Sequence, residues 1–491
     1  MLQSIFTKEW LKTRLFLIIY SMATLGLLAY LLLSIHSTLV ESGRIEVWAT
    51  MIGRDMIFVD LLKYVPLVFG VALALTQWLP EMINKRLKLT LHLPVSAAQS
   101  IGCMLCFGVV ATIILTIICL VVLSIVEAFW FPGEIILHTL RKLIPAFCWG
   151  TVIYLVSSWI MLEVMAAAIR TTIMPHTKYV VIGLIVVLCC FFHTQIERLI
   201  MPQPLKTPFV LYSNLDSTFI RFETQDRVTR YIDFRGKEWT KHQTDSLLPL
   251  FSYRQLVAEE RLPDTICGHY VTPKIIQRNN FHFKTSPKQL NYSRIPLYTM
   301  LESRSGLVNL VLPPDVFRLT NTGLEFIDCE SNKVLKAKSI SFTRELEKHG
   351  FIFPVKLIWG NASTRKNYDN GFLLTDQNDR LFQLTMQRGI PTVREVITDG
   401  QRWRQLFTIE PANMELIGLV VSSDNQLYAV RQDATLAHID IDEYDPQTMQ
   451  ITIVGDMLQW TITLYTEHDT RYYAVNPLSF ELLCDSILQD P

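Results

Sequence analysis

The sequence has no excess of charge of either sign, because 45 Lys and Arg residues are balanced by 45 Asp and Glu residues. Domains that hold nucleic acid through its phosphates carry a basic excess, so the totals predict no nucleic-acid partner. Cysteine is scarce after about residue 205, where only Cys267, Cys329 and Cys484 occur. Three widely spaced cysteines do not form a disulfide framework, although their number still allows one disulfide.

The chain also lacks the short motifs that mark common enzymes. It contains no Gly-x-Ser-x-Gly, no His-Glu-x-x-His and no Cys/His set at metal-ligand spacing. The P-loop pattern Gly-x-x-x-x-Gly-Lys-(Ser/Thr), which cradles nucleotide phosphates, is missing as well. We therefore predict a chain that is not itself an enzyme and that holds no cofactor or metal. Any ATP hydrolysis would belong to a separate subunit.

Long apolar runs dominate the first part of the chain. A spanning helix needs roughly 20 mostly apolar residues, and we predict five spans, at about 14–35, 59–80, 100–129, 143–169 and 176–195. The first run is longer than the apolar core of a signal peptide and no cleavage site follows it, so we expect it to be retained. From about residue 205 the composition becomes that of a soluble protein. The sequence thus predicts a transmembrane α-helical bundle over residues 1–200, followed by a soluble domain.

Basic residues near the span ends predict the orientation, because cytoplasmic loops carry an excess of Lys and Arg. One face would hold Lys8, Lys12, Arg14, Lys85, Arg86, Lys88, Arg170 and Lys178. The other would hold Arg44, Arg54, Lys63, Arg141 and Lys142. We therefore place the N-terminus in the cytoplasm. Five spans then put the C-terminal domain outside the cytoplasm, whereas four or six spans would leave it inside.

Two short segments carry recognisable patterns. Met1–Lys12 places Leu2, Ile5, Phe6 and Trp10 at helical spacing, which suits either a helix lying in the membrane interface or an extension of the first span. The loop from Glu81 to Ser96 alternates leucines with polar residues, and Pro94 then stops any helix.

These segments resemble the permease subunits of type-2 ABC transporters, the exporter-like family. That family has an N-terminal elbow helix with a Lys-Glu pair, matched here by Lys8-Glu9 and followed by Trp10. It also has an acidic-basic stretch ending in Leu-Pro-(Val/Leu)-Ser between the second and third spans, matched by Leu93-Pro94-Val95-Ser96. The resemblance covers roughly residues 1–195. It departs from the family in one respect, since the family usually has six spans with both termini in the cytoplasm.

The resemblance implies a multi-pass permease in the inner (cytoplasmic) membrane that works as a homodimer and couples a separate cytoplasmic ATPase to export or envelope transport of a substrate. The loop would be the coupling helix that docks into the ATPase, with Glu81, Lys85, Arg86, Leu87, Lys88, Leu91, Leu93 and Pro94. Glu163, an ionisable residue late in the fourth span, is a candidate for a polar role within the membrane. The alternative hypothesis is a non-transporting membrane-anchored binding or sensor protein whose outer domain binds a ligand or an envelope protein.

The soluble half is predicted to be rich in β-structure. Residues 201–315 read as a connecting mixed region and residues 316–491 as a β-rich domain. In the latter, a strand, a turn with Asp or Asn and a second strand recur about every 45–57 residues, a period typical of propeller blades. The pattern is consistent with a partial β-propeller, with a β-sandwich or with an antiparallel domain whose hairpins recur by chance.

Overall fold

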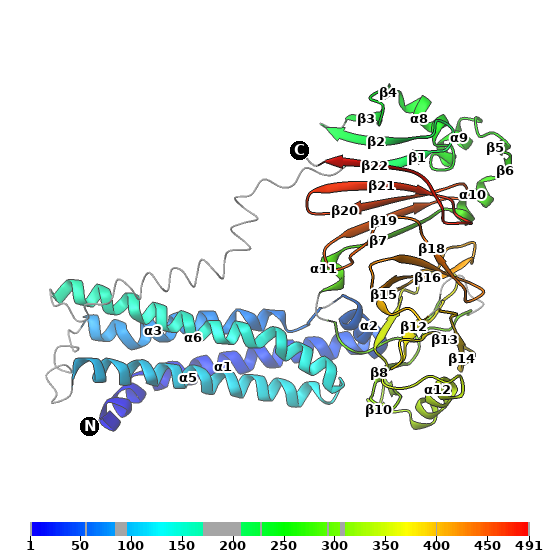
Figure 1. Cartoon of the computed structure of the whole chain (residues 1–491). Coiled ribbons are helices and arrows are strands. Elements are labelled where there is room, and N and C mark those ends of the chain that lie inside the picture. Colours follow the sequence, from blue (N-terminus) through cyan, green and yellow to red (C-terminus); the bar gives the residue numbers. More distant parts are fainter. Residues whose placement is uncertain are drawn as a thin grey trace. The chain divides into compact units, whose positions relative to one another are not determined.

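The computed structural model describes residues 2–54, 56–83, 96–169, 208–225, 228–291, 294–304, 310–398 and 400–489. The chain divides into two compact units, Met1–Leu205 and Lys206–Pro491. The first is helical and the second is rich in β-strands, as the sequence predicted (Figure 1).

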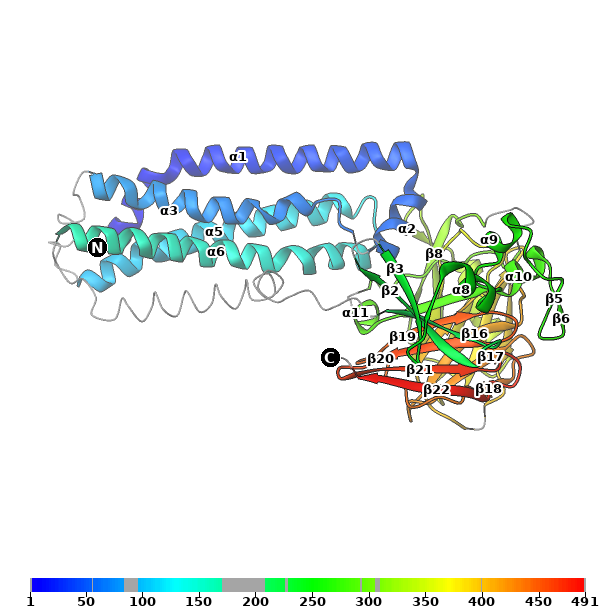
Figure 2. The ribbon, with the colours of Figure 1, turned by 90° about the horizontal axis from the view of Figure 1, so that it is seen from above.

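The helical unit is built from four long helices that run side by side (Figure 2). These are α1 (Leu2–Ser42), α3 (Val65–Ile83), α5 (Ala97–Glu127) and α6 (Gly133–Ile169), with the short α2 (Arg44–Arg54) and the 3₁₀ helix η1 (Asp60–Lys63) after α1. Within the described residues, 4 helices are long and apolar enough to cross a membrane. They match four of the predicted spans, and the fifth, 176–195, lies outside the described residues.

The helices of this unit turn apolar side chains outward, as a lipid environment requires. Leu15, Leu33 and Ile114 are examples of large apolar side chains left exposed along the spans. Inward, small residues bring backbones close together. A Cβ placed on Gly150 of α6 would lie 2.5 Å from Cβ of Pro66 in α3. Gly108 of α5 likewise leaves room for the ring of Tyr154 from α6. Close approach through small residues is the usual way in which helices associate in membranes.

The β unit consists of several antiparallel sheets. The first contains β1 (Phe209–Ser213), β2 (Thr218–Gln225), β3 (Val228–Asp233) and β4 (Glu238–Trp239). Between this sheet and the next come α8 (Lys241–Leu247), α9 (Tyr253–Ala258), the hairpin β5 (Thr265–Ile266) and β6 (His269–Tyr270), α10 (Pro273–Asn279), β7 (Phe281–Thr285) and α11 (Pro287–Leu290).

Three further sheets follow along the chain. One contains β8 (Asp315–Leu319), β9 (Leu324–Asp328) and β10 (Lys333–Val334), and α12 (Lys336–Lys348) follows it. The next contains β11 (Leu357–Gly360), β12 (Phe372–Thr375), β13 (Leu381–Gln387) and β14 (Ile390–Glu395). The third contains β15 (Trp403–Thr408), β16 (Leu416–Ser422), β17 (Leu427–Arg431) and β18 (Leu436–His438). The last sheet has the order β22 (Leu482–Gln489), β21 (Asp469–Val475), β20 (Trp460–Tyr465), β19 (Gln450–Gly455) and β7.

The predicted strand–turn–strand units are present as hairpins. They include β12–β13, which pairs Phe372 with Leu384, and β16–β17, which pairs Leu419 with Ala429. The turns use the Asp and Asn residues for a backbone reason: Asp379 and Asn425 have φ of 65° and 61°, a left-handed conformation that these residue types tolerate.

Apolar cores lie between successive sheets rather than inside one closed sandwich. Phe317 of β8 packs edge-on against Phe372 of β12, with ring centroids 5.1 Å apart. Phe407 of β15 packs against Phe283 of β7 at 5.2 Å. At the other end, Tyr472 of β21 packs near a ring of the β1–β4 sheet. Within the described residues the sheets form an open series from β8–β10 to β1–β4, as Figure 1 shows.

The described residues of the stretch predicted as a connecting mixed region, 201–315, include the β1–β4 sheet, the β5–β6 hairpin and strand β7. Strand β7 pairs antiparallel with β19, so that Phe283 lies opposite Ile453. This pairing joins segments far apart in the sequence, and no local pattern signals it. The second compact unit begins at Lys206.

Candidate functional site

Four charged side chains meet where the first turns of α1 contact the last turn of α3. We call Lys8, Glu9, Lys12 and Glu81 the charge cluster. Nζ of Lys12 lies 2.7 Å from Oε2 of Glu9 and 3.1 Å from Oε1 of Glu81. Nζ of Lys8 lies 3.0 Å from the same Glu81 oxygen. Both carboxylates are buried, with 0% and 2% of Glu9 and Glu81 exposed.

Local helix geometry explains why Lys8, Glu9 and Lys12 lie close together. Lys8 and Lys12 are four residues apart and Glu9 precedes Lys12 by three, so all three lie on adjacent positions of one helix. Glu81 comes from the end of α3, which brings a second carboxylate to the two ammonium groups. The cluster balances two positive charges against two negative ones, and this pairing is what allows carboxylates to be buried at all.

A neutral hydrogen-bond chain continues from the charge cluster into the bundle. Gln77 lies one turn before Glu81 on α3 and is fully buried. The hydroxyl of Tyr154 in α6 donates to Oε1 of Gln77 at 2.7 Å, and Nε2 of Gln77 donates to the carbonyl of Met104 in α5 at 2.7 Å. Together, the cluster and this chain connect all four long helices through polar side chains.

The structure brings together some of the predicted site residues and leaves others apart. Lys8 of the elbow segment pairs with Glu81 of the loop, and Glu9 pairs with Lys12, which also contacts Glu81. Trp10 is half exposed. The segment forms the first turns of α1, continuous with the span, as an extension of that span would. Glu163 lies in α6, where its Oε1 is buried without a hydrogen-bond partner. The remaining loop residues lie outside the described part of the chain: Lys85, Arg86, Leu87, Lys88, Leu91, Leu93 and Pro94.

Sequence reasoning did not assign Lys12, Gln77 or Tyr154 to the site. A glutamine within an apolar span is unusual, and that signal alone could have marked Gln77. The partners of Lys12 could not be found in the same way. Its contact with Glu81 joins positions 69 residues apart in the sequence.

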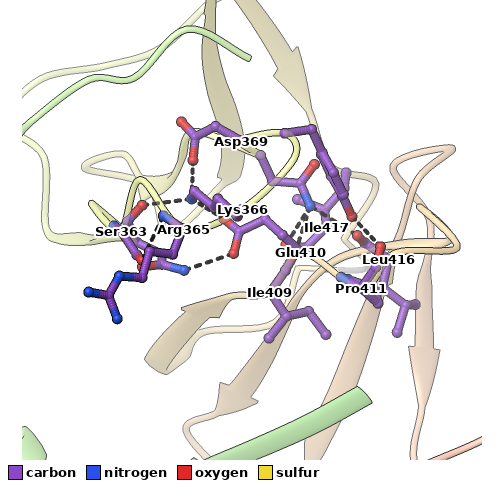
Figure 3. Close-up of polar contacts among 12 residues, drawn as sticks. Ser363, Arg365, Lys366, Asp369, Ile409, Glu410, Pro411, Leu416 and Ile417 are labelled. Atoms are coloured by element: carbon purple, nitrogen blue, oxygen red, sulfur yellow. Dashed lines mark hydrogen bonds and ion pairs between the residues drawn. The ribbon is translucent and has the colours of Figure 1, made fainter. Parts of the chain in front are cut away.

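The β unit contains a second buried polar network, which Figure 3 shows. Nζ of Lys366, in the loop after β11, contacts Oδ1 of Asp369 at 2.5 Å and Oε1 of Glu410 at 2.7 Å. Asn370 donates from Nδ2 to the carbonyls of Ile409 at 2.7 Å and Leu416 at 3.0 Å. The network joins the loop before β12 to the loop between β15 and β16. We call it the polar clamp, because it holds two successive sheets together.

Burial raises the pKa of Asp369 from 3.8 to about 6, although the nearby Lys366 opposes the rise. A carboxyl with a raised folded-state pKa contributes stability that is complete below its unfolded pKa and is lost as pH rises through the folded value. The stabilising contribution of Asp369 is thus complete below pH 3.8 and is lost as the pH rises from 3.8 to about 6. Two pH units correspond to on the order of 3 kcal/mol.

We therefore predict that Asp369→Asn, which is neutral at every pH, gains stability relative to the unchanged chain as pH rises from 3.8 through about 6. Thermal unfolding of both chains across this range measures the difference. The matched control is Asp433→Asn, since that carboxylate is exposed and its pKa is lowered by the Thr435 side chain. A stability difference for Asp369→Asn that is constant with pH would contradict the assignment.

Within the described residues, no group of three or more His, Cys, Asp or Glu side chains is arranged to hold a metal ion. The two networks are accordingly electrostatic and hydrogen-bonded in character. Each connects elements far apart in the sequence, and the charge cluster does so at the segment that begins the predicted coupling loop.

Comparison with known proteins finds a family match for the second unit. Residues 209–475 match the family described as "Domain of unknown function (DUF4857)". No curated protein matches the chain.

Two solved structures are similar at a distance. One is described as the structure of the Dos1 propeller, with 10% identity, 57% of this chain and 60% of that chain covered, and a TM-score of 0.21. The other is PorZ, described as an essential bacterial surface component of the type-IX secretion system of Porphyromonas gingivalis, with 8% identity, coverage of 59% and 33%, and a TM-score of 0.19. The chain thus spans less than two thirds of either structure, and at these TM-scores neither defines its fold.

Proposed function

The chain belongs to the DUF4857 family, and from the residues described above we propose that it is the membrane permease subunit of an ABC transporter complex. In this proposal it couples a separate cytoplasmic ATPase to export or envelope transport of a substrate. Two copies form the complex, as the resemblance to type-2 permeases implies.

The observation that supports this proposal best is the charge cluster. A permease must transmit movement of its coupling loop to its membrane helices. Here Glu81, where the loop begins, is held by Lys8 and Lys12 of the elbow segment through buried ion pairs. Gln77 and Tyr154 then connect this point to α5 and α6. A displacement of the loop would therefore reach every long helix through polar contacts that are costly to break.

The proposal includes a membrane topology for the chain. The N-terminus and the loop 84–95 lie in the cytoplasm, a fifth span crosses within 176–195, and the β unit lies outside. The β unit is a partial β-propeller, because successive antiparallel sheets of three to five strands with cores between them are the way propeller blades pack.

The loop is the place to test the proposal. Replacing Leu87 and Leu91 with Asp adds two charges to the apolar side of the predicted coupling helix, so the ATPase should no longer co-purify with the chain. A control adds one negative charge to an exposed apolar residue of the β unit, Val311→Asp, and should leave the complex intact. Equal recovery of the ATPase with both variants would overturn the proposal, provided that both reach the membrane in equal amount.

A second candidate function is a membrane-anchored binding protein that does not transport. A cavity of about 500 Å³ in the β unit favours it, since pockets of this size hold small ligands. The two functions differ in a simple observable. A binding protein would keep its ligand affinity with no ATPase associated, whereas a permease would be purified with one.

A further inference from the structure

The cavity of about 500 Å³ is lined by segments of the β unit that are far apart in the sequence. Strand β1, the segment from α8 to α9, strand β7 and the turn between β19 and β20 all contribute to its wall. Neither the charge cluster nor the polar clamp takes part in it. A role for this cavity therefore does not depend on the residues that support the transport proposal.

One part of the wall is apolar. Leu211, Leu248 and Leu250 line it and are buried. At the rim, Phe209 and Phe251 are 38% and 48% exposed, with ring centroids 5.8 Å apart. Exposed aromatic rings beside a concave apolar surface offer contact area to a flat or bulky ligand.

Another part of the wall presents a carboxylate without a basic partner. Asp456 follows β19, and its Oδ1 accepts hydrogen bonds from the backbone N–H groups of Leu458 at 2.7 Å and Gln459 at 2.9 Å. Burial raises the pKa of this carboxyl to about 6, and only backbone hydrogen bonds oppose the rise. Among the described residues, no Lys or Arg forms an ion pair with Asp456, so its charge is met by dipoles alone.

Two further acceptors in the same wall have no donor. Nε2 of Gln459 donates to the carbonyl of Tyr212 and to Oδ2 of Asp456, each at 3.1 Å, which fixes the orientation of the amide. Oε1 of Gln459 is then left buried without a hydrogen-bond partner. Asn280 repeats the pattern: Nδ2 donates to the carbonyl of Leu250 at 2.9 Å, and Oδ1 is buried and unpartnered.

The wall therefore contains one carboxylate and two acceptor oxygens without donors, beside an apolar surface with two aromatic rings. We propose that this cavity binds a small organic amine with an aromatic body. The ammonium group, which carries three donors and a positive charge, lies against Asp456, and the aromatic body lies among Leu211, Leu248 and the rim phenylalanines. A ligand that supplies hydrogen-bond donors would satisfy these acceptors.

The basic groups near the rim do not oppose this assignment. Arg254 is exposed, and its Nε donates to the hydroxyl of Tyr253 at 3.1 Å; water screens its charge. His282 also lines the cavity, and burial lowers its pKa from 6.5, so its ring is neutral at pH 7.

The test uses three probes with one aromatic body and different polar ends, titrated calorimetrically into the full chain in lipid nanodiscs. Tryptamine carries an ammonium group, tryptophol a hydroxyl and indole-3-propionate a carboxylate. We expect tryptamine to bind at one site per chain and at least about tenfold more tightly than tryptophol, since about 1.4 kcal/mol is a factor of ten. Indole-3-propionate should bind more weakly still. Equal affinity for the three probes, or no binding of tryptamine, would overturn the proposal.

Variants locate the site. Asp456→Asn keeps an oxygen to accept from the two backbone N–H groups and removes the charge, so it should abolish the preference for tryptamine over tryptophol. Phe251→Ala should weaken both probes. The control Tyr270→Ala changes an exposed aromatic residue outside the cavity wall and should leave both affinities unchanged. Tryptamine affinity unchanged in Asp456→Asn would contradict the assignment. If Asp456→Asn does not fold, the comparison of Phe251→Ala with Tyr270→Ala tests whether the probes bind in this cavity. No ATPase is present in these measurements, so their failure would leave the transport proposal standing.

Discussion

Replacing Lys12 with methionine is expected to destabilise the helical unit by about 3–5 kcal/mol, the usual cost of removing one partner from a buried ion pair. Lys12 contacts both Glu9 and Glu81, and both carboxylates are buried. Methionine fills similar space but supplies no charge, so Glu9 is left ionised without its partner or must take up a proton. Unfolding of the full chain in mixed micelles of increasing SDS content measures the loss.

The control for this variant is Lys63→Met. Lys63 pairs with Asp60, but their side chains are 33% and 57% exposed, and exposed pairs contribute about 0–1 kcal/mol. A second change provides a rescue: Glu9→Gln in the Lys12→Met chain removes the unpaired charge and should recover much of the stability. Equal and small losses for Lys12→Met and Lys63→Met would show that the charge cluster does not hold α1 to α3.

Replacing Gly150 with leucine is expected to disrupt the packing of α6 on α3. The added Cβ alone would lie 2.5 Å from Cβ of Pro66 and 2.7 Å from its backbone oxygen, so the helices must move apart. Overpacking of this kind typically costs about 1–3 kcal/mol, and contact with backbone atoms, which cannot rotate away, places the expected loss at the upper end. The better helix propensity of leucine returns only about 1 kcal/mol.

Gly102→Leu is the matched control, because a Cβ at Gly102 of α5 would meet no atom within 4 Å. This variant gains the same helix propensity without the clash, and it should be as stable as the unchanged chain or more so. The same SDS titration compares the two. A Gly150→Leu chain as stable as the Gly102→Leu chain would contradict the described crossing of α3 and α6.

The features that the sequence predicted best are those that depend on local pattern. The spans at 14–35, 59–80, 100–129 and 143–169 follow from long apolar runs, and each overlaps one of the long helices over most of its length. The β hairpins follow from short apolar runs around Asp- and Asn-containing turns. In both cases the physical cause acts over neighbouring residues, so no knowledge of the tertiary structure is needed.

The features that were missed depend on contacts between distant segments. The pairing of β7 with β19 joins Phe281–Thr285 to a strand about 170 residues later in the sequence. The polar clamp needs Glu410, 44 residues from Lys366, and only the contact of Lys366 with Asp369 is local. The cavity of the β unit combines residues from Phe209 to Thr461. Side chains of these types occur throughout the sequence, and only the fold selects the ones that meet.

The proposed coupling role of the loop can be tested most directly by cross-linking in native membranes. A photoreactive amino acid would replace Leu87 in the full chain, and the protein captured on illumination would be identified by mass spectrometry. The account predicts an ATPase with a P-loop, captured at position 87 and not when the same photoreactive residue replaces Val311 of the β unit. Capture of an unrelated protein at position 87, or the same ATPase at both positions, would contradict it.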